Sequence, residues 1–185
     1  MDKWIDFYAP FFESREKARQ FVEDLEKLSK KHVAKLMMHQ AQRLVSLADD
    51  FPQIRAGNES LQLLFLLICA EHISKLHADF NLEGQSKAYT RRFFEELLTR
   101  GDQDRLRSGF RRENLQSLNL REIVDLLYDV RCDVVHEGKY WGFHFHDGKT
   151  AMINTDPDVN VYIRLQEFRD IVVRGCINAV KTYRI

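Results

Sequence analysis

The stretch NLREIVDLLYDVRCDVVHEG, residues 119–138, contains the start, the apolar pattern and the stop signal of a helix. Asn119 and Glu122 have the spacing of a capping box, and Gly138 suits the residue that follows a helix. At about 100° per residue, one narrow stripe of this helix is apolar and contains Ile123, Leu127, Val130 and Val134. The sequence therefore predicts a helix from Leu120 to about His136 whose stripe faces the core.

A second, partly apolar face lies a quarter-turn or more away from that stripe. It contains Val124, Tyr128, Arg131 and Val135, and it continues through Cys132 and His136. Surface helices do not usually carry two apolar faces, so either this helix is central or its second face meets a partner. The mixture of apolar side chains with one arginine and one histidine favours a site or an interface.

Arg131 and His136 are five residues apart, so on an ideal helix they point about 140° away from each other. The pair of one chain forms a compact site only if the helix ends at His136. Two copies meeting across a symmetry axis offer another solution, because each copy would add an Arg and a His to one cleft.

The chain before this helix has the spacing of three more helices. Three-and-four spacing predicts one long amphipathic helix from Ser14 to about Ala48, stopped by the sequence DDFP at 49–52. Asn58 is expected to cap a helix from Glu59 to about His77, which is apolar almost all round and therefore central. A further helix is expected from about Ser86 to Thr99.

The remaining chain adds a small β element to this helical pattern. Residues 101–116 are weakly periodic and predict a loop or a short helix. Asp147-Gly148 signals a hairpin, Val159 to Ile163 alternate as in a strand, and helical spacing returns from Gln166 to about Tyr183. With no repeat and no linker, the sequence predicts one mainly α domain over residues 1–185, with a small β-hairpin or strand element before the C-terminal helix.

The composition is that of an ordinary water-soluble protein, with 44% hydrophobic and 30% charged residues. The N-terminal sequence lacks the apolar region of a signal peptide, and the apolar run at 61–70 is half as long as a membrane span. Three widely spaced cysteines, Cys69, Cys132 and Cys176, favour reduced thiols over a disulfide framework. We therefore expect a cytoplasmic protein without a membrane segment.

The formal net charge is zero, so binding of phosphate would need a local basic patch. One candidate patch lies in the sequence DRLRSGFRRE and consists of Arg105, Arg107, Arg111 and Arg112, with Phe110 available to stack on a base. Asp104 and Glu113 partly cancel its charge. A solvated, salt-bridged surface is an equal interpretation of this stretch.

The sequence LLYDVRCDVVHEGKYW, residues 126–141, resembles the hallmark of HEPN domains: an Arg, four to six residues, and a His at a helix end. It is especially similar to abortive-infection and Apea-like members, and residues 59–72 resemble the second helix of that group. The resemblance implies a HEPN-like antiparallel helical bundle that forms a homodimer through the motif helix. It also implies a metal-independent endoribonuclease, without a cofactor, acting in toxin, antiphage or RNA-processing systems.

Cleavage of RNA without metal requires proton transfer at the 2′-OH and stabilisation of the phosphate charge. His136 can transfer protons near neutral pH, and Arg131 offers a planar fork of donors to the phosphoryl group. Asp133 lies three residues before His136 and could orient its imidazole. The expected products are a 2′,3′-cyclic phosphate and a 5′-OH, and DNA should be inert.

Cys132 favours a non-catalytic alternative, because active HEPN members often have Asn, Asp or His directly after the Arg. In this alternative the chain is a module that binds RNA or a protein partner, such as a nucleotidyltransferase-type antitoxin. The neutral net charge favours the same interpretation.

Two further features have a structural and a functional interpretation. Glu71 lies in the apolar second helix, where a carboxylate needs a partner, so it is either a boundary residue or bonded to Arg131. His144 and His146, with His136, are a weak zinc signal without a cysteine pair or a carboxylate at ligand spacing. Solvent-facing strand histidines are the preferred interpretation.

Overall fold

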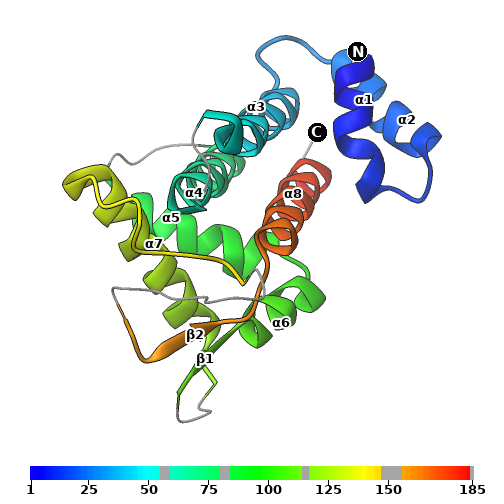
Figure 1. The fold of residues 1–185 in the computed structure, drawn as a ribbon. Coiled ribbons are helices and arrows are strands. Elements are labelled where there is room, and N and C mark those ends of the chain that lie inside the picture. Colours follow the sequence, from blue (N-terminus) through cyan, green and yellow to red (C-terminus); the bar gives the residue numbers. More distant parts are fainter. Residues whose placement is uncertain (55–58, 80–83, 114–116, 147–155, 184–185) are drawn as a thin grey trace.

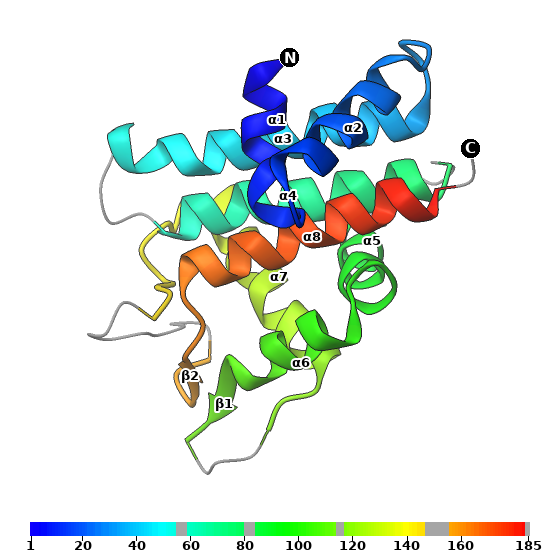
Figure 2. The same ribbon diagram turned by 90° about the vertical axis from the view of Figure 1, so that its right-hand side faces the viewer.

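The computed structural model describes residues 1–54, 59–79, 84–113, 117–146 and 156–183 (Figure 1). Helix α4 (Glu59–His77) lies at the centre and contacts α3 (Val33–Ile54), α5 (Ser86–Arg92), α7 (Leu120–Glu137) and α8 (Leu165–Thr182). Figure 2 shows the axes of α3, α4 and α8 lying side by side, with α3 running opposite to the other two and α7 crossing behind them. The predicted helix over 59–77 is confirmed in its central place, whereas Asn58 lies outside the described residues.

The predicted long helix over 14–48 is wrong, because the chain turns between residues 27 and 32. A short α1 (Asp2–Tyr8) and η1 (Ala9–Phe11) precede α2 (Arg15–Glu26), which Ser14 caps by accepting a bond from the Lys17 N–H at 3.2 Å. After α2, the buried Lys35 ammonium donates to the carbonyl oxygens of Glu26 and Leu28, at 2.8 and 3.4 Å. These bonds satisfy carbonyls released at the end of α2, so α2 can fold back against α3.

Helix α3 passes through the predicted stop at 49–52 and ends at Ile54. Pro52 has no N–H, so the carbonyl of Ala48 lacks the donor that a helix supplies four residues later. The Gln62 Nε2 atom of α4 donates to this carbonyl at 3.1 Å. A contact between two helices thus compensates a defect that a lone helix would retain.

The predicted helix over 86–99 is present as α5 and a π-helical turn, η2 (Phe93–Leu97). The C-terminal helix predicted over 166–183 is confirmed as α8. Within 101–116, the short helix is confirmed as part of α6 (Arg100–Ser108).

A two-stranded antiparallel sheet joins β1 (Phe110–Arg112) to β2 (Val159–Val161), with Phe110 opposite Val161. The sequence predicted β2 but not its partner, and the predicted hairpin at Asp147-Gly148 lies outside the described residues. Gly109 permits the pairing, because a Cβ there would lie 2.7 Å from the Ile163 Cβ atom. The mainly α bundle with a small β element is therefore confirmed.

Candidate functional site

Helix α7 begins and ends as the sequence predicts. The Asn119 side chain accepts a bond from the Glu122 N–H at 3.0 Å, and the Glu122 carboxylate accepts one from the Asn119 N–H at 2.8 Å. Gly138 follows the helix with φ +66°, in the left-handed region that glycine adopts without strain. The predicted core stripe of Ile123, Leu127, Val130 and Val134 is buried. The two caps therefore fix the ends of α7, and with them the positions of the residues on its second face.

Arg131 lies on this second face and is held from α4. Its Nη2 atom lies 3.6 Å from the Oε2 atom of Glu71, a carboxylate that is only 8% exposed. The Arg131 guanidinium also lies over the Tyr128 ring, 5.2 Å from its centroid. The structure thus supports a contact of Glu71 with Arg131, in the form of an ion pair that is longer than a hydrogen bond.

Glu71 has a second cationic partner that sequence reasoning missed. Lys75, one turn later on α4, forms an ion pair with the Glu71 Oε1 atom and lies over the Tyr89 ring at 5.7 Å. The four-residue spacing of Glu71 and Lys75 was a readable signal for this pair. The Glu71 carboxylate therefore contacts two cations, one from α4 and one from α7.

The Tyr128 ring contacts two cations, since Lys87 of α5 lies 5.6 Å from its centroid in addition to Arg131. Burial raises the pKa of the Tyr128 hydroxyl. Lys87 also pairs with Asp129 at 3.3 Å, next to a bidentate pair of Arg91 with Asp125 at 2.5 and 2.6 Å. These contacts attach α5 to α7.

His136 lies in the last turn of α7 and is exposed. Because α7 continues to Glu137, Arg131 and His136 keep the angular separation of an ideal helix and do not converge within one chain. No hydrogen bond joins Asp133 to His136 among the described residues, and Cys132 is a half-buried free thiol. The predicted catalytic residues thus share one helix, but the fold of a single chain does not assemble them.

The predicted basic patch is largely neutralised by ion pairs. Arg105 pairs with Glu167, Arg107 pairs with Asp104 at 2.6 Å, and Arg112 pairs with Asp156 at 3.3 Å. In the part of the chain that the structure describes, the exposed Arg111 has no ion pair.

Phe110 corrects the sequence interpretation of the same stretch. Its side chain is fully buried as the first residue of β1, so it cannot stack on a base. The adjacent Arg111 reaches the surface because side chains alternate along a strand, whereas Arg112 is half-buried. Together with the ion pairs, the burial of Phe110 favours the solvated, salt-bridged interpretation.

The histidines after α7 do not form the histidine strand that the sequence predicted. His144 and His146 lie in irregular chain, and the His144 Nδ1 atom lies 3.8 Å from the Glu59 Oε2 atom. The described residues contain no group of three potential ligands close enough to hold a metal ion.

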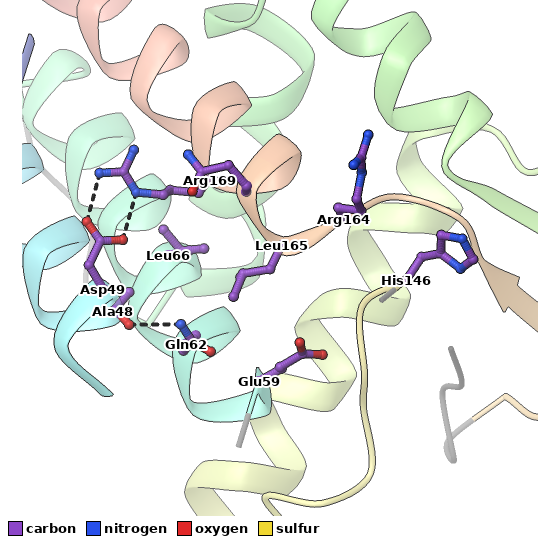
Figure 3. A pocket seen from close by; sticks show the side chains of 10 residues that line it. Ala48, Asp49, Glu59, Gln62, Leu66, His146, Arg164, Leu165 and Arg169 are labelled. Carbon is purple, nitrogen blue, oxygen red and sulfur yellow. Dashed lines mark hydrogen bonds and ion pairs between the residues drawn. The ribbon is translucent and has the colours of Figure 1, made fainter. Parts of the chain in front are cut away.

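A pocket of about 650 Å³ lies where the end of α3, the start of α4 and the start of α8 meet (Figure 3). Asp49 and Arg169 close one wall through two bonds of 2.7 Å, and Leu66 and Leu165 form an apolar surface. The Glu59 carboxylate faces the pocket while accepting a bond from the Phe145 N–H at 2.6 Å. None of the predicted catalytic residues lines this pocket, and its paired charges join α3 to α8.

Comparison of the chain with protein-family models, with curated proteins and with solved structures gives no match. None of the helices in the described ranges is both long and apolar enough to cross a lipid bilayer. Any statement about function therefore rests on the residues of this chain.

Proposed function

We propose that the protein is a HEPN-like, metal-independent endoribonuclease whose active site forms between two copies of α7. The observation that carries the proposal is the anchoring of Arg131. Its guanidinium is held between the buried Glu71 carboxylate and the Tyr128 ring, on the same helix as the exposed His136. A half-buried arginine with a fixed guanidinium is suited to bind one phosphate in a defined orientation.

The proposed chemistry divides between the two side chains. His136 would remove the proton of the ribose 2′-OH or supply one to the leaving 5′ oxygen, and Arg131 would stabilise the charge that develops on the phosphate. Asp133 lies on the adjacent helix face and is available to orient the imidazole once RNA is bound. Attack by the 2′ oxygen on phosphorus breaks the bond to the 5′ oxygen and leaves a 2′,3′-cyclic phosphate.

The angular separation of Arg131 and His136 is the reason to propose a dimer. Two α7 helices related by a two-fold axis would place the Arg of one copy near the His of the other. Exposed apolar side chains at this end of α7 support such a contact: Val135 is 48% exposed and Trp141 is 59% exposed. Val135 directly precedes His136, so the contact would lie beside the proposed site.

The test is incubation of the purified protein with labelled RNA in EDTA, beside the variants Arg131→Ala and His136→Ala. We expect cleavage by the wild type, cyclic-phosphate ends on its products, and a loss of about a hundredfold or more in either variant. His146→Ala is the matched control, because this histidine lies outside α7 and should leave cleavage unchanged. Equal cleavage by the wild type and His136→Ala would overturn the proposal.

A non-catalytic module that binds RNA or a protein partner is the second candidate. Two observations favour it: the half-buried Cys132 beside Arg131, and the ion pairs that occupy Arg105, Arg107 and Arg112. RNA bound by a dimer without any product, and released by Arg131→Ala, would select this candidate. Val135→Asp, which places a charge in the proposed contact, should weaken the dimer in both cases.

A further inference from the structure

Two of the three cysteines meet inside the helical core. Cys69 lies on α4 and Cys176 on α8, 107 residues apart in sequence, and their Sγ atoms are 3.7 Å apart. Both are free thiols whose residues are at most 1% exposed. A separation of 3.7 Å is van der Waals contact between sulfur atoms, so the two thiols are close enough to react with each other.

The packing around Cys176 holds this contact in place. Its neighbour Gly175 lies so close to η2 that a Cβ atom would come within 2.6 Å of the Phe93 ring and 2.7 Å of the Leu98 side chain. Helix α8 therefore cannot move away from this layer without opening the core. Cys132, on the second face of α7, is half-buried and takes no part in the pair.

We propose that Cys69 and Cys176 form an oxidisable dithiol, in which a small two-electron oxidant such as hydrogen peroxide creates a disulfide between α4 and α8. One sulfur attacks a peroxide oxygen, the O–O bond breaks, and a sulfenic acid and one water result. The second sulfur attacks the sulfenic sulfur and expels the second water. Two thiols thus lose two electrons and two protons, and the peroxide is reduced to two waters.

The structure favours a slow reaction with a stable product. Only the thiolate is nucleophilic, and burial raises the pKa of the Cys176 thiol well above its ordinary value. Oxidation should therefore be faster at higher pH and when the core opens transiently. Forming the bond brings the Sγ atoms to about 2 Å, a movement of less than about 1 Å for each. The cross-link would close a loop of about 100 residues and restrict the unfolded chain.

The experiment uses the full chain carrying Cys132→Ser, so that only the two core thiols remain. The protein is treated with hydrogen peroxide at about pH 8, a few degrees below its thermal midpoint, and its intact mass is measured. We expect a loss of about 2 Da in a monomer and a rise of several degrees in Tm. Digestion should give a linked peptide containing Cys69 and Cys176, and dithiothreitol should reverse all three changes.

The same chain with Cys69→Ala or Cys176→Ala is the matched control and should show no loss of 2 Da. Peptide mapping needs neither of these core variants, so the test holds even if one of them folds poorly. A gain of oxygen atoms without the linked peptide would overturn the proposal. The proposal would also be overturned if a thiol assay still counted two free thiols after peroxide treatment near the thermal midpoint. The two cysteines would then have been exposed to the oxidant without forming a disulfide.

Discussion

A single side chain, Gln62, allows α3 to continue past its proline. Its amide nitrogen donates to the Ala48 carbonyl at 3.1 Å, where the missing N–H of Pro52 leaves no helical donor. Gln62 is 7% exposed, so most of its side chain is removed from bulk water. A buried carbonyl without a donor costs about 1–3 kcal/mol, which is a large part of the stability of a small protein.

Replacing the Gln62 amide should therefore destabilise the protein, and the loss should be larger when residue 52 is a proline. Gln62→Met keeps the length of the side chain and should lower the free energy of unfolding by about 1–2 kcal/mol. In a Pro52→Ala background the new N–H can serve the Ala48 carbonyl, so the same change should cost less. Urea unfolding of the wild type, the two single variants and the double variant gives the coupling free energy between Gln62 and Pro52. An equal loss of unfolding free energy for Gln62→Met in both backgrounds would contradict this explanation.

The buried Glu71 carboxylate should matter for both stability and the proposed activity. Glu71→Gln leaves Lys75 and Arg131 without their anion and should lower the free energy of unfolding by about 2–3 kcal/mol. It should also slow RNA cleavage, because the Arg131 guanidinium loses one of its two supports. In an Arg131→Met background its stability cost should be smaller, since only the contact with Lys75 is then lost. If the losses of unfolding free energy for Glu71→Gln and Arg131→Met simply add in the double variant, the ion pair of 3.6 Å between Arg131 and Glu71 contributes nothing to stability.

At the scale of elements, the end of α7 is set by one backbone conformation. Among the described residues outside its own helix and chain neighbours, no atom lies within 4 Å of a Cβ built on Gly138, so we attribute the cost of a side chain there to φ +66°. Gly138→Ala should lower the free energy of unfolding by about 1 kcal/mol, and Gly138→Asn by less, because Asn tolerates the left-handed region.

Gly101 is the matched control for this prediction. It lies in the first turn of α6, and the contact that a Cβ there would make within the described residues is with the Thr99 Oγ1 atom, at 3.9 Å. Gly101→Ala should therefore be neutral or slightly stabilising in the same urea titration. An equal loss at both glycines would show that the conformation at Gly138 is not what limits α7.

At the scale of the whole molecule, His77 joins the end of α4 to two other elements. Its Nδ1 atom lies 3.2 Å from the Nη2 atom of Arg92, which can only donate, and its Nε2 atom lies 3.2 Å from the Thr182 Oγ1 atom. The Thr182 hydroxyl already donates to the Asn178 carbonyl at 2.8 Å. These contacts assign a neutral imidazole that accepts at Nδ1 and donates at Nε2.

This arrangement predicts a pH dependence of stability with a definite sign. Burial, followed by the Arg92 guanidinium, lowers the pKa of His77 below its ordinary value of 6.5. The unfolded chain then binds the proton more tightly, so the contribution is present above about pH 6.5 and is lost as the pH falls toward the lowered pKa. We expect the urea midpoint to fall between about pH 7.5 and pH 5.

A non-titrating replacement isolates this histidine from the others. His77→Gln can keep an acceptor toward Arg92 and a donor toward Thr182, so it should lose less stability over the same pH range than the wild type. His72, whose pKa burial also lowers, remains in both proteins and contributes equally to each. Identical pH profiles would show that the contacts of His77 do not depend on its protonation.

The sequence by itself determined the features that depend on neighbours along the chain. The capping box of α7, its core stripe, the all-round apolar α4, strand β2 and helix α8 all follow from local spacing, and each is present. The same spacing places Arg131 and His136 on one helix and gives their angular separation, whereas their selection as candidate residues rests mainly on the resemblance of residues 126–141 to the HEPN motif.

The tertiary structure decided what depends on contacts between distant segments. Lys35 closes the turn between α2 and α3, and Gln62 carries α3 through Pro52, although the apolar periodicity passes through both places unchanged. The pairing of β1 with β2, the burial of Phe110 and the meeting of Cys69 with Cys176 have no local signal either. The physical reason is that periodicity reports which side of an element faces the core, whereas partners are chosen when the elements pack together.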